Sequence, residues 1–177
     1  MPHAHKVVVF LGISLDGFIA GPGGDLSWLS ECAKESSAET GYDTLMAQTD
    51  ALVLGRNTYD SVLRFNEWPF GSKPVYVLTH RPLAPVHGEC ALQGSIEEAL
   101  RTVQASGAKS IYLDGGEVVR QALQLNLVNE LVLSWVPVVL GSGIRLFAEG
   151  LPPSRWRLMQ SRPFQSGMVQ ASYRNAH

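Results

Sequence analysis

The sequence predicts an α/β domain of three layers, in which helices flank a mixed, mostly parallel central sheet and an antiparallel hairpin forms the C-terminal end. Apolar runs of strand length alternate along the chain with segments whose apolar residues recur at helical spacing. Two of these strands end in glycine and lead directly into a helix, at Gly55 and at Gly115-Gly116. Since 177 residues are enough to bury one full core, we expect a single domain over residues 1–177.

The first half of the chain contributes three of the expected strands. Lys6 to Ile13 is almost continuously apolar, which is typical of a central strand covered on both faces. A capping box at Ser36 to Glu39 predicts the start of a helix. Strands then follow at residues 50–55 and 73–78, and a helix begins at Arg56 between them.

The second half adds the remaining elements. We expect a weaker strand at residues 89–93, a capped helix from Ser95 to about Gly107, a strand at 110–114 and a helix at 117–123. Residues 129–140 predict a long strand in which Pro137 implies a bulge or an edge position, because proline cannot donate to a ladder. Residues 155–160 and 168–173 flank a Gln-Ser-Gly turn and predict a closing antiparallel hairpin.

Composition excludes several classes of partner. The formal net charge of -2 and the lack of a basic tract give no reason to expect nucleic acid. The longest apolar run, Leu131 to Leu140, is too short to span a membrane. The two cysteines, Cys32 and Cys90, fit a reduced cytoplasmic protein better than a disulfide scaffold, and we expect no metal site.

Possible anion ligands follow three of the strands. Gly115-Gly116 lies between a strand and a helix, where free N–H groups and the helix dipole can hold a phosphate. Arg56 and Thr58 follow the strand that ends at Gly55, and Thr79 and Arg81 follow the strand at 73–78. Ordinary turn and capping chemistry is an alternative for each, but ligands of open α/β sheets gather outside the carboxyl ends of strands. The recurrence therefore favours a nucleotide site.

Two carboxylates are candidates for contact with a substrate. Asp16 interrupts an apolar segment before Gly17, and it either closes a local Asx-type turn or faces a ligand from a strand end. Asp43 shares a helix face with Glu39, where a solvated carboxylate and a proton donor are both possible.

Four motifs carry a family resemblance that covers the chain from Val7 to Tyr173. In order, they are Ser14-Leu15-Asp16-Gly17-Phe18-Ile19-Ala20, Gly55-Arg56-Asn57-Thr58-Tyr59, Leu113-Asp114-Gly115-Gly116 and Pro137-Val138-Val139-Leu140-Gly141-Ser142-Gly143. With these motifs the chain resembles the dihydrofolate reductase superfamily. It is most similar to the C-terminal reductase domain of the riboflavin-biosynthesis deaminase-reductase, here in a stand-alone form.

The resemblance implies a dihydrofolate reductase-like fold with NADPH lying across the strand ends. The residues implied in cofactor binding are Ile13, Gly17, Gly55, Arg56, Thr58, Thr79, Arg81, Gly115, Gly116, Glu117 and Val118. The catalytic candidates are Asp16 and Asp43, and the substrate candidates are Trp28, Tyr42 and Trp135.

The implied function is an NADPH-dependent reductase that transfers hydride to a small heterocyclic or carbonyl substrate. The candidate substrate from riboflavin biosynthesis is 5-amino-6-(5-phosphoribosylamino)uracil, although nothing in the chain resembles the zinc-ligand pattern of the deaminase. A dihydrofolate or pterin reductase and a non-catalytic NADP-binding protein are the alternatives. The resemblance also implies a homodimer, with Trp135 and the run from Leu131 to Leu140 as its apolar surface.

Overall fold

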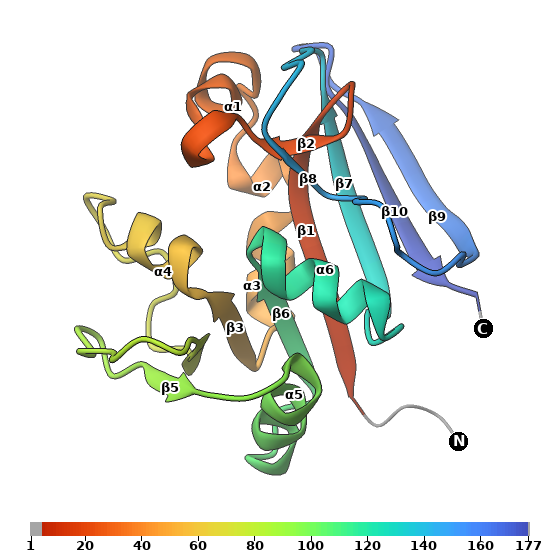
Figure 1. Cartoon of the computed structure of the whole chain (residues 1–177). Helices are drawn as coiled ribbons and strands as arrows, with labels where there is room; N and C mark the ends of the chain where they lie inside the picture. Colours follow the sequence, from red (N-terminus) through yellow and green to blue (C-terminus); the bar gives the residue numbers. More distant parts are fainter. Residues whose placement is uncertain (1–4, 177) are drawn as a thin grey trace.

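A computed structural model describes residues 5–176, and its central feature is an eight-stranded mixed sheet (Figure 1). From edge to edge the strands are β5 (Cys90–Leu92), β4 (Val75–Leu78), β3 (Ala51–Gly55), β6 (Ser110–Asp114), β1 (Lys6–Ser14), β7 (Glu130–Val136), β10 (Val169–Asn175) and β9 (Trp156–Pro163). Neighbours from β5 to β7 pair in parallel, whereas β10 runs antiparallel to both β7 and β9. The predicted fold class and the predicted closing hairpin are both confirmed.

Helices cover both faces of the sheet, which gives the three expected layers. Helices α5 (Ile96–Ala105) and α6 (Gly116–Gln124) pack on one face, and α3 (Tyr42–Gln48) and α4 (Arg56–Val62) pack on the other. The alternation along β3 shows the division, because Val53 joins the apolar cluster of the first face while Leu52 and Leu54 join the second. All three side chains are fully buried, and burying each stabilises the fold by about 1.5–3 kcal/mol.

The region between β1 and β3 contains three short helices instead of one. The predicted capping box of Ser36 and Glu39 is present, but it opens only the four-residue α2 (Ser37–Thr40). Gly41 then adopts φ +79°, which ends α2 and allows α3 to start in a new direction. Helix α1 (Ser27–Cys32) was not expected from the sequence, because it is only six residues long and its N-cap makes no side-chain hydrogen bond.

The predicted strand at 129–140 is wrong at its C-terminal end. Strand β7 stops at Val136, directly before Pro137, and it lies inside the sheet between β1 and β10 and not at an edge. Because proline has no N–H group, the ladder cannot continue, and residues 137–143 form a loop. This loop leads into β8 (Ile144–Arg145), which pairs with β2 (Phe18–Ala20) beyond the carboxyl ends of β1 and β7 (Figure 1). A single 3₁₀ turn, η1 (Pro22–Gly24), follows β2.

In the described range, residues 5–176, the helices are all too short or too polar to cross a membrane.

Candidate functional site

The glycine turns after β3 and β6 lie against each other at the carboxyl edge of the sheet. Gly115 has φ +115°, and a Cβ atom built on it would lie 2.9 Å from Thr58 Oγ1 and 3.2 Å from the backbone nitrogen of Gly55. Val118 completes the contact, because its Cγ1 lies 3.6 Å from the position of a Cβ atom on Gly55. Gly115 is therefore required for the close approach of the two turns. The structure brings together four residues that were expected to bind the cofactor.

Helix α6 begins at this edge without a side-chain cap. Its first residue is Gly116, and the preceding Gly115 has no side chain to accept a hydrogen bond from the first turn. A Cβ atom on Gly116 would lie 3.0 Å from Ile19 Cδ1 and 3.2 Å from Ile144 Cγ2, so β2 and β8 close one side of the turn. Glu117, in the first turn, forms an ion pair with Arg120 of its own helix, which offsets part of the carboxylate charge near the N-terminus.

Two arginines converge on one carboxylate next to these turns. Arg56 Nε donates to Asp60 Oδ1 at 2.8 Å, and Arg81 Nη2 donates to Asp60 Oδ2 at 3.3 Å. Thr79 is buried and its Oγ1 accepts a hydrogen bond from the Arg81 backbone nitrogen at 3.0 Å, which fixes the turn that presents Arg81. Two positive charges share one negative charge, so this end of the site attracts anions. The sequence had not drawn attention to Asp60, although its i,i+4 spacing from Arg56 is a visible signal.

The carboxyl end of β1 carries the next predicted residues. Ile13 is fully buried and pairs in register with Trp135 of β7, which is half-buried against the same apolar cluster. Gly17 follows in the loop to β2 with φ +90°, and its carbonyl accepts a hydrogen bond from the Leu146 backbone nitrogen at 3.2 Å. Trp135 therefore lies beside the residue that was expected to contact the nicotinamide.

Asp16 uses both of its carboxylate oxygens inside the protein. Oδ1 accepts hydrogen bonds from Ser14 Oγ at 2.7 Å and from the Leu140 backbone nitrogen at 3.1 Å, and Oδ2 accepts one from the Gly141 backbone nitrogen at 2.7 Å. The hydrogen bond from Ser14, together with those from the two backbone N–H groups, lowers the pKa of Asp16 to about 2. The side chain is ionised at neutral pH and is poorly suited to donate a proton. Ser14 is a local partner, whereas both N–H groups come from residues more than 120 positions away and not from the neighbouring backbone of an Asx-type turn.

A second carboxylate, Asp114, has the opposite environment. It ends β6 directly before the glycine pair, and its Oδ1 accepts a hydrogen bond from the Gly115 backbone nitrogen at 2.8 Å. Burial raises its pKa to about 6. Tyr42 of α3 and Tyr112 of β6 lie next to it, with their ring centroids 6.1 Å apart. Burial, and then the charge of Asp114, raise the pKa of Tyr42 to about 12, so that both phenols stay protonated.

Asp114 was missed as a catalytic candidate, although the sequence places an acid directly before the glycine pair at a strand end. Its burial could not be deduced from that spacing. Asp43, which had been favoured, is exposed in the first turn of α3. Trp28 is 5% exposed and packs with Val136 and Met168, so the structure places it in the core, near the carboxyl end of β7 where Trp135 lies.

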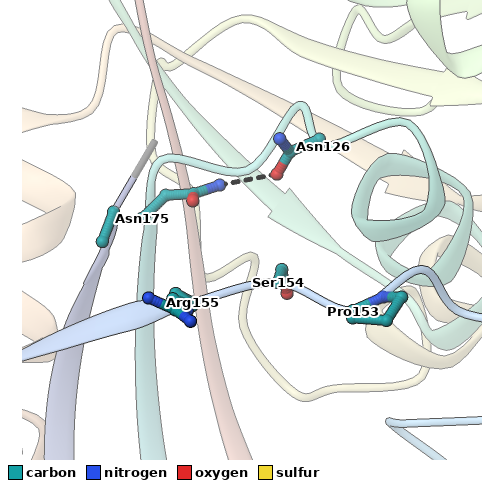
Figure 2. Close-up of a pocket in the computed structure, with 6 residues that line it drawn as sticks. Asn126, Pro153, Ser154, Arg155 and Asn175 are labelled. Atoms are coloured by element: carbon teal, nitrogen blue, oxygen red, sulfur yellow. Dashed lines mark hydrogen bonds between the residues drawn. The ribbon is translucent and has the colours of Figure 1, made fainter.

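A pocket of about 460 Å³ lies at the other end of the sheet (Figure 2). Asn175 Nδ2 donates to Asn126 Oδ1 at 2.8 Å across one side of it, and Ser154 and Arg155 lie nearby. These residues belong to the amino end of β7 and its neighbours, where no predicted site residue lies. Among residues 5–176, His, Cys, Asp and Glu side chains form no group of three or more that could hold a metal ion.

Sheet order and site geometry define the class of protein. The structure of dihydrofolate reductase from Enterococcus faecalis matches with a TM-score of 0.68 at 16% identity, covering 97% of each chain, so the fold is dihydrofolate reductase-like. Residues 5–170 match the RibD C-terminal domain, and the chain belongs to that family.

Two similar proteins match almost from end to end. The uncharacterized protein YwjB of Bacillus subtilis is 32% identical over 171 residues, which cover 95% of this chain and 97% of YwjB. A structure from Shewanella sp. PV-4, named "Putative riboflavin biosynthesis protein", has a TM-score of 0.88 at 32% identity and covers 97% of this chain and 99% of its own.

The residues present fit the NADPH that the family implies. The start of α6, which no side chain caps, suits a pyrophosphate, and the lack of a side chain on Gly115 allows the Gly55 turn to lie against it. Arg56 and Arg81 supply guanidinium groups for a further phosphate, with Thr79 holding the turn that carries Arg81.

Proposed function

We propose that this chain is an NADPH-dependent reductase that acts on a small heterocyclic substrate. The observation that carries the proposal is the contact between the Gly55 and Gly115 turns, next to the shared Arg56–Asp60–Arg81 cluster. The uncapped start of α6 beside these turns offers N–H groups that lack intrahelical partners, and the neighbouring guanidinium groups match the 2′-phosphate that distinguishes NADPH from NADH.

The substrate that the family favours is an aminopyrimidine, 5-amino-6-(5-phosphoribosylamino)uracil. When bound, NADPH would supply the hydride and become NADP⁺. The substrate heteroatom that gains negative charge then needs a proton. Asp114 is suited to donate it, because a pKa of about 6 leaves part of the population protonated near neutral pH. Ile13 and Trp135 exclude water from the adjacent strand ends.

The first experiment is a thermal-shift titration with NADPH and with NADH, followed by a turnover assay with the aminopyrimidine and with dihydrofolate. A ligand that binds only the folded state raises the unfolding temperature by mass action, so NADPH should give the larger shift. Oxidation of NADPH by the aminopyrimidine supports the proposal, whereas oxidation by dihydrofolate favours a folate reductase. Binding without turnover of either supports a non-catalytic NADP-binding protein. No shift with either nucleotide overturns the proposal.

We also propose that the chain forms a homodimer, with a different surface from the one first expected. Leu131 and Leu133 of β7 are buried inside the sheet and cannot form an interface. Strand β9 is the sheet edge nearest to them, and its Leu158 and Met159 are 54% and 48% exposed. An edge strand with unpaired backbone groups and exposed apolar side chains favours pairing with a second copy. A cytoplasmic location, expected from the unpaired cysteines, belongs to the same proposal.

A further inference from the structure

Two loops meet at the carboxyl ends of β1 and β7, and one carboxylate lies between them. The first loop joins β1 to β2 and contains Asp16, and the second is residues 137–143. Asp16 accepts the N–H groups of Leu140 and Gly141 from the second loop while Ser14 donates to it from the first. Ser14 Oγ in turn accepts the Phe18 N–H group at 2.9 Å, so the end of β1, the carboxylate and the start of β2 form one connected network. We call this network the Asp16 clasp.

Further contacts join the same two loops beside the clasp. The Leu15 N–H group donates to the Val138 carbonyl at 2.8 Å, and Arg145 Nη1 donates to the Asp16 carbonyl at 3.2 Å. Gly143 approaches β2 so closely that a Cβ atom on it would lie 2.1 Å from the Ala20 carbonyl oxygen. The small β2–β8 sheet that results has little freedom to shift.

The β2–β8 sheet forms one wall of the turn at the start of α6. Ile19 from β2 and Ile144 from β8 both lie against Gly116, at 3.0 and 3.2 Å from the position of its missing Cβ atom. A displacement of either loop would therefore move this wall relative to the N–H groups of α6. The clasp connects a carboxylate that faces neither the arginine cluster nor Asp114 to the geometry of the cofactor turn.

We propose that Asp16 is a positioning residue, whose carboxylate holds the 14–18 and 137–143 loops together so that Ile19 and Ile144 shape the cofactor site at Gly116. This inference rests on the proposed function, because it concerns how the same site is held. It assigns Asp16 no direct contact with the transferred hydride or proton, which differs from the catalytic role expected from the sequence.

The test compares Asp16→Asn with Asp25→Asn. An asparagine offers one acceptor oxygen and one donor NH₂ group, so it cannot accept from both Leu140 and Gly141 as the carboxylate does. Asp25 is the matched control, because its exposed carboxylate accepts hydrogen bonds from the neighbouring Ser27. Hydrogen–deuterium exchange of the unliganded proteins measures the clasp, and titration with NADPH measures the cofactor site.

Asp16→Asn should speed exchange in residues 137–146 by about tenfold and weaken NADPH binding by about tenfold, since hydrogen bonds to a charged group are lost. Asp25→Asn should change neither quantity. If Asp16→Asn speeds exchange but binds NADPH with wild-type affinity, its role is only structural and the inference is wrong. Unchanged exchange also overturns it.

Two further measurements keep the outcome decisive. If Asp16→Asn does not fold, Ser14→Ala removes the two hydrogen bonds of Ser14 but keeps those from Leu140 and Gly141, and it should produce both effects in smaller degree. A wild-type protein that fails to bind NADPH would overturn the proposed function and this inference with it. If the wild type, Asp16→Asn and Ser14→Ala bind NADPH with equal affinity, the inference alone is wrong. Where the aminopyrimidine is turned over, the pH profile of Asp16→Asn should keep the wild-type shape, because a positioning residue does not transfer the proton.

Discussion

Asp114→Asn is expected to stabilise the protein above pH 7 while it removes most of the turnover. Burial raises the pKa of Asp114 from 3.8 to about 6. The unfolded chain ionises near its ordinary pKa, whereas the folded chain keeps its proton until about pH 6. Stability therefore falls as the pH rises through this window and stays lower above it. Roughly two pKa units at about 1.4 kcal/mol each give a cost of about 3 kcal/mol at most.

Asparagine resembles the protonated acid and can still accept the hydrogen bond from the Gly115 backbone nitrogen. The variant should unfold at about the wild-type temperature at pH 3, where the Asp114 carboxyl of the wild type is protonated in both the folded and the unfolded chain. At pH 8 it should unfold several degrees higher, since about 1 kcal/mol corresponds to about 2–4 °C in a chain of this size. Thermal unfolding at the two pH values measures this difference. Asp43→Asn is the control, because it makes the same chemical change at an exposed position in the first turn of α3.

Turnover of the aminopyrimidine tests the other half of the prediction. Loss of a general acid should lower kcat by about 10²- to 10⁴-fold while NADPH still raises the unfolding temperature. In the wild-type protein kcat/KM should fall about tenfold per pH unit above pH 6, as the protonated form disappears. A variant that is no more stable than wild type at pH 8 would refute the burial argument. A variant with wild-type turnover would show that the proton comes from another group.

Three other changes test separate parts of the site and the proposed dimer. Arg81→Ala should weaken NADPH binding about tenfold or more with little effect on NADH, while Arg64→Ala, another exposed arginine, should change neither in a titration. Gly115→Ala should lose NADPH binding and unfold at lower temperature, because its φ of +115° and the contact with the Gly55 backbone leave no room for a methyl group. Leu158→Lys on β9 should shift sedimentation from dimer to monomer at micromolar concentration, and a wild-type monomer would contradict the homodimer.

The repeated unit of strand, glycine turn and helix is what made the fold predictable. Its signals are local: apolar strands of five or six residues, glycines at Gly55 and Gly115, and helical spacing after each. The predicted bounds of helices and strands are wrong where a single residue interrupts the pattern of its neighbours. Gly41 adopts a positive φ and divides a helix that the capping box alone would have continued, and Pro137 ends a strand whose apolar pattern runs on to residue 140.

The site was only partly predictable, because its decisive contacts join distant segments. The Gly55 and Gly115 turns could be expected at one sheet edge, since parallel strands present their carboxyl ends together. No local pattern showed that Asp60 pairs with Arg81 as well as with Arg56, because that contact depends on how α4 and the turn after β4 are placed. A Gly116→Val substitution could not test pyrophosphate binding by itself, because its side chain would also clash with Ile19 and Ile144.

The two aspartates at the centre of the site show why residue type alone did not assign the chemistry. Asp16 has a pKa near 2 because one hydroxyl and two backbone N–H groups donate to its carboxylate. Asp114 has a pKa near 6 because its desolvation outweighs the hydrogen bonds with the Gly115 backbone nitrogen and the Tyr112 side chain. A carboxylate that accepts several hydrogen bonds stays ionised and can hold neighbouring segments together. A buried carboxyl group with fewer donors keeps a proton that it can donate. The surroundings of Asp16 therefore do not fit the catalytic role that its motif suggested, and we propose Asp114 as the acid and Asp16 as the support of the site.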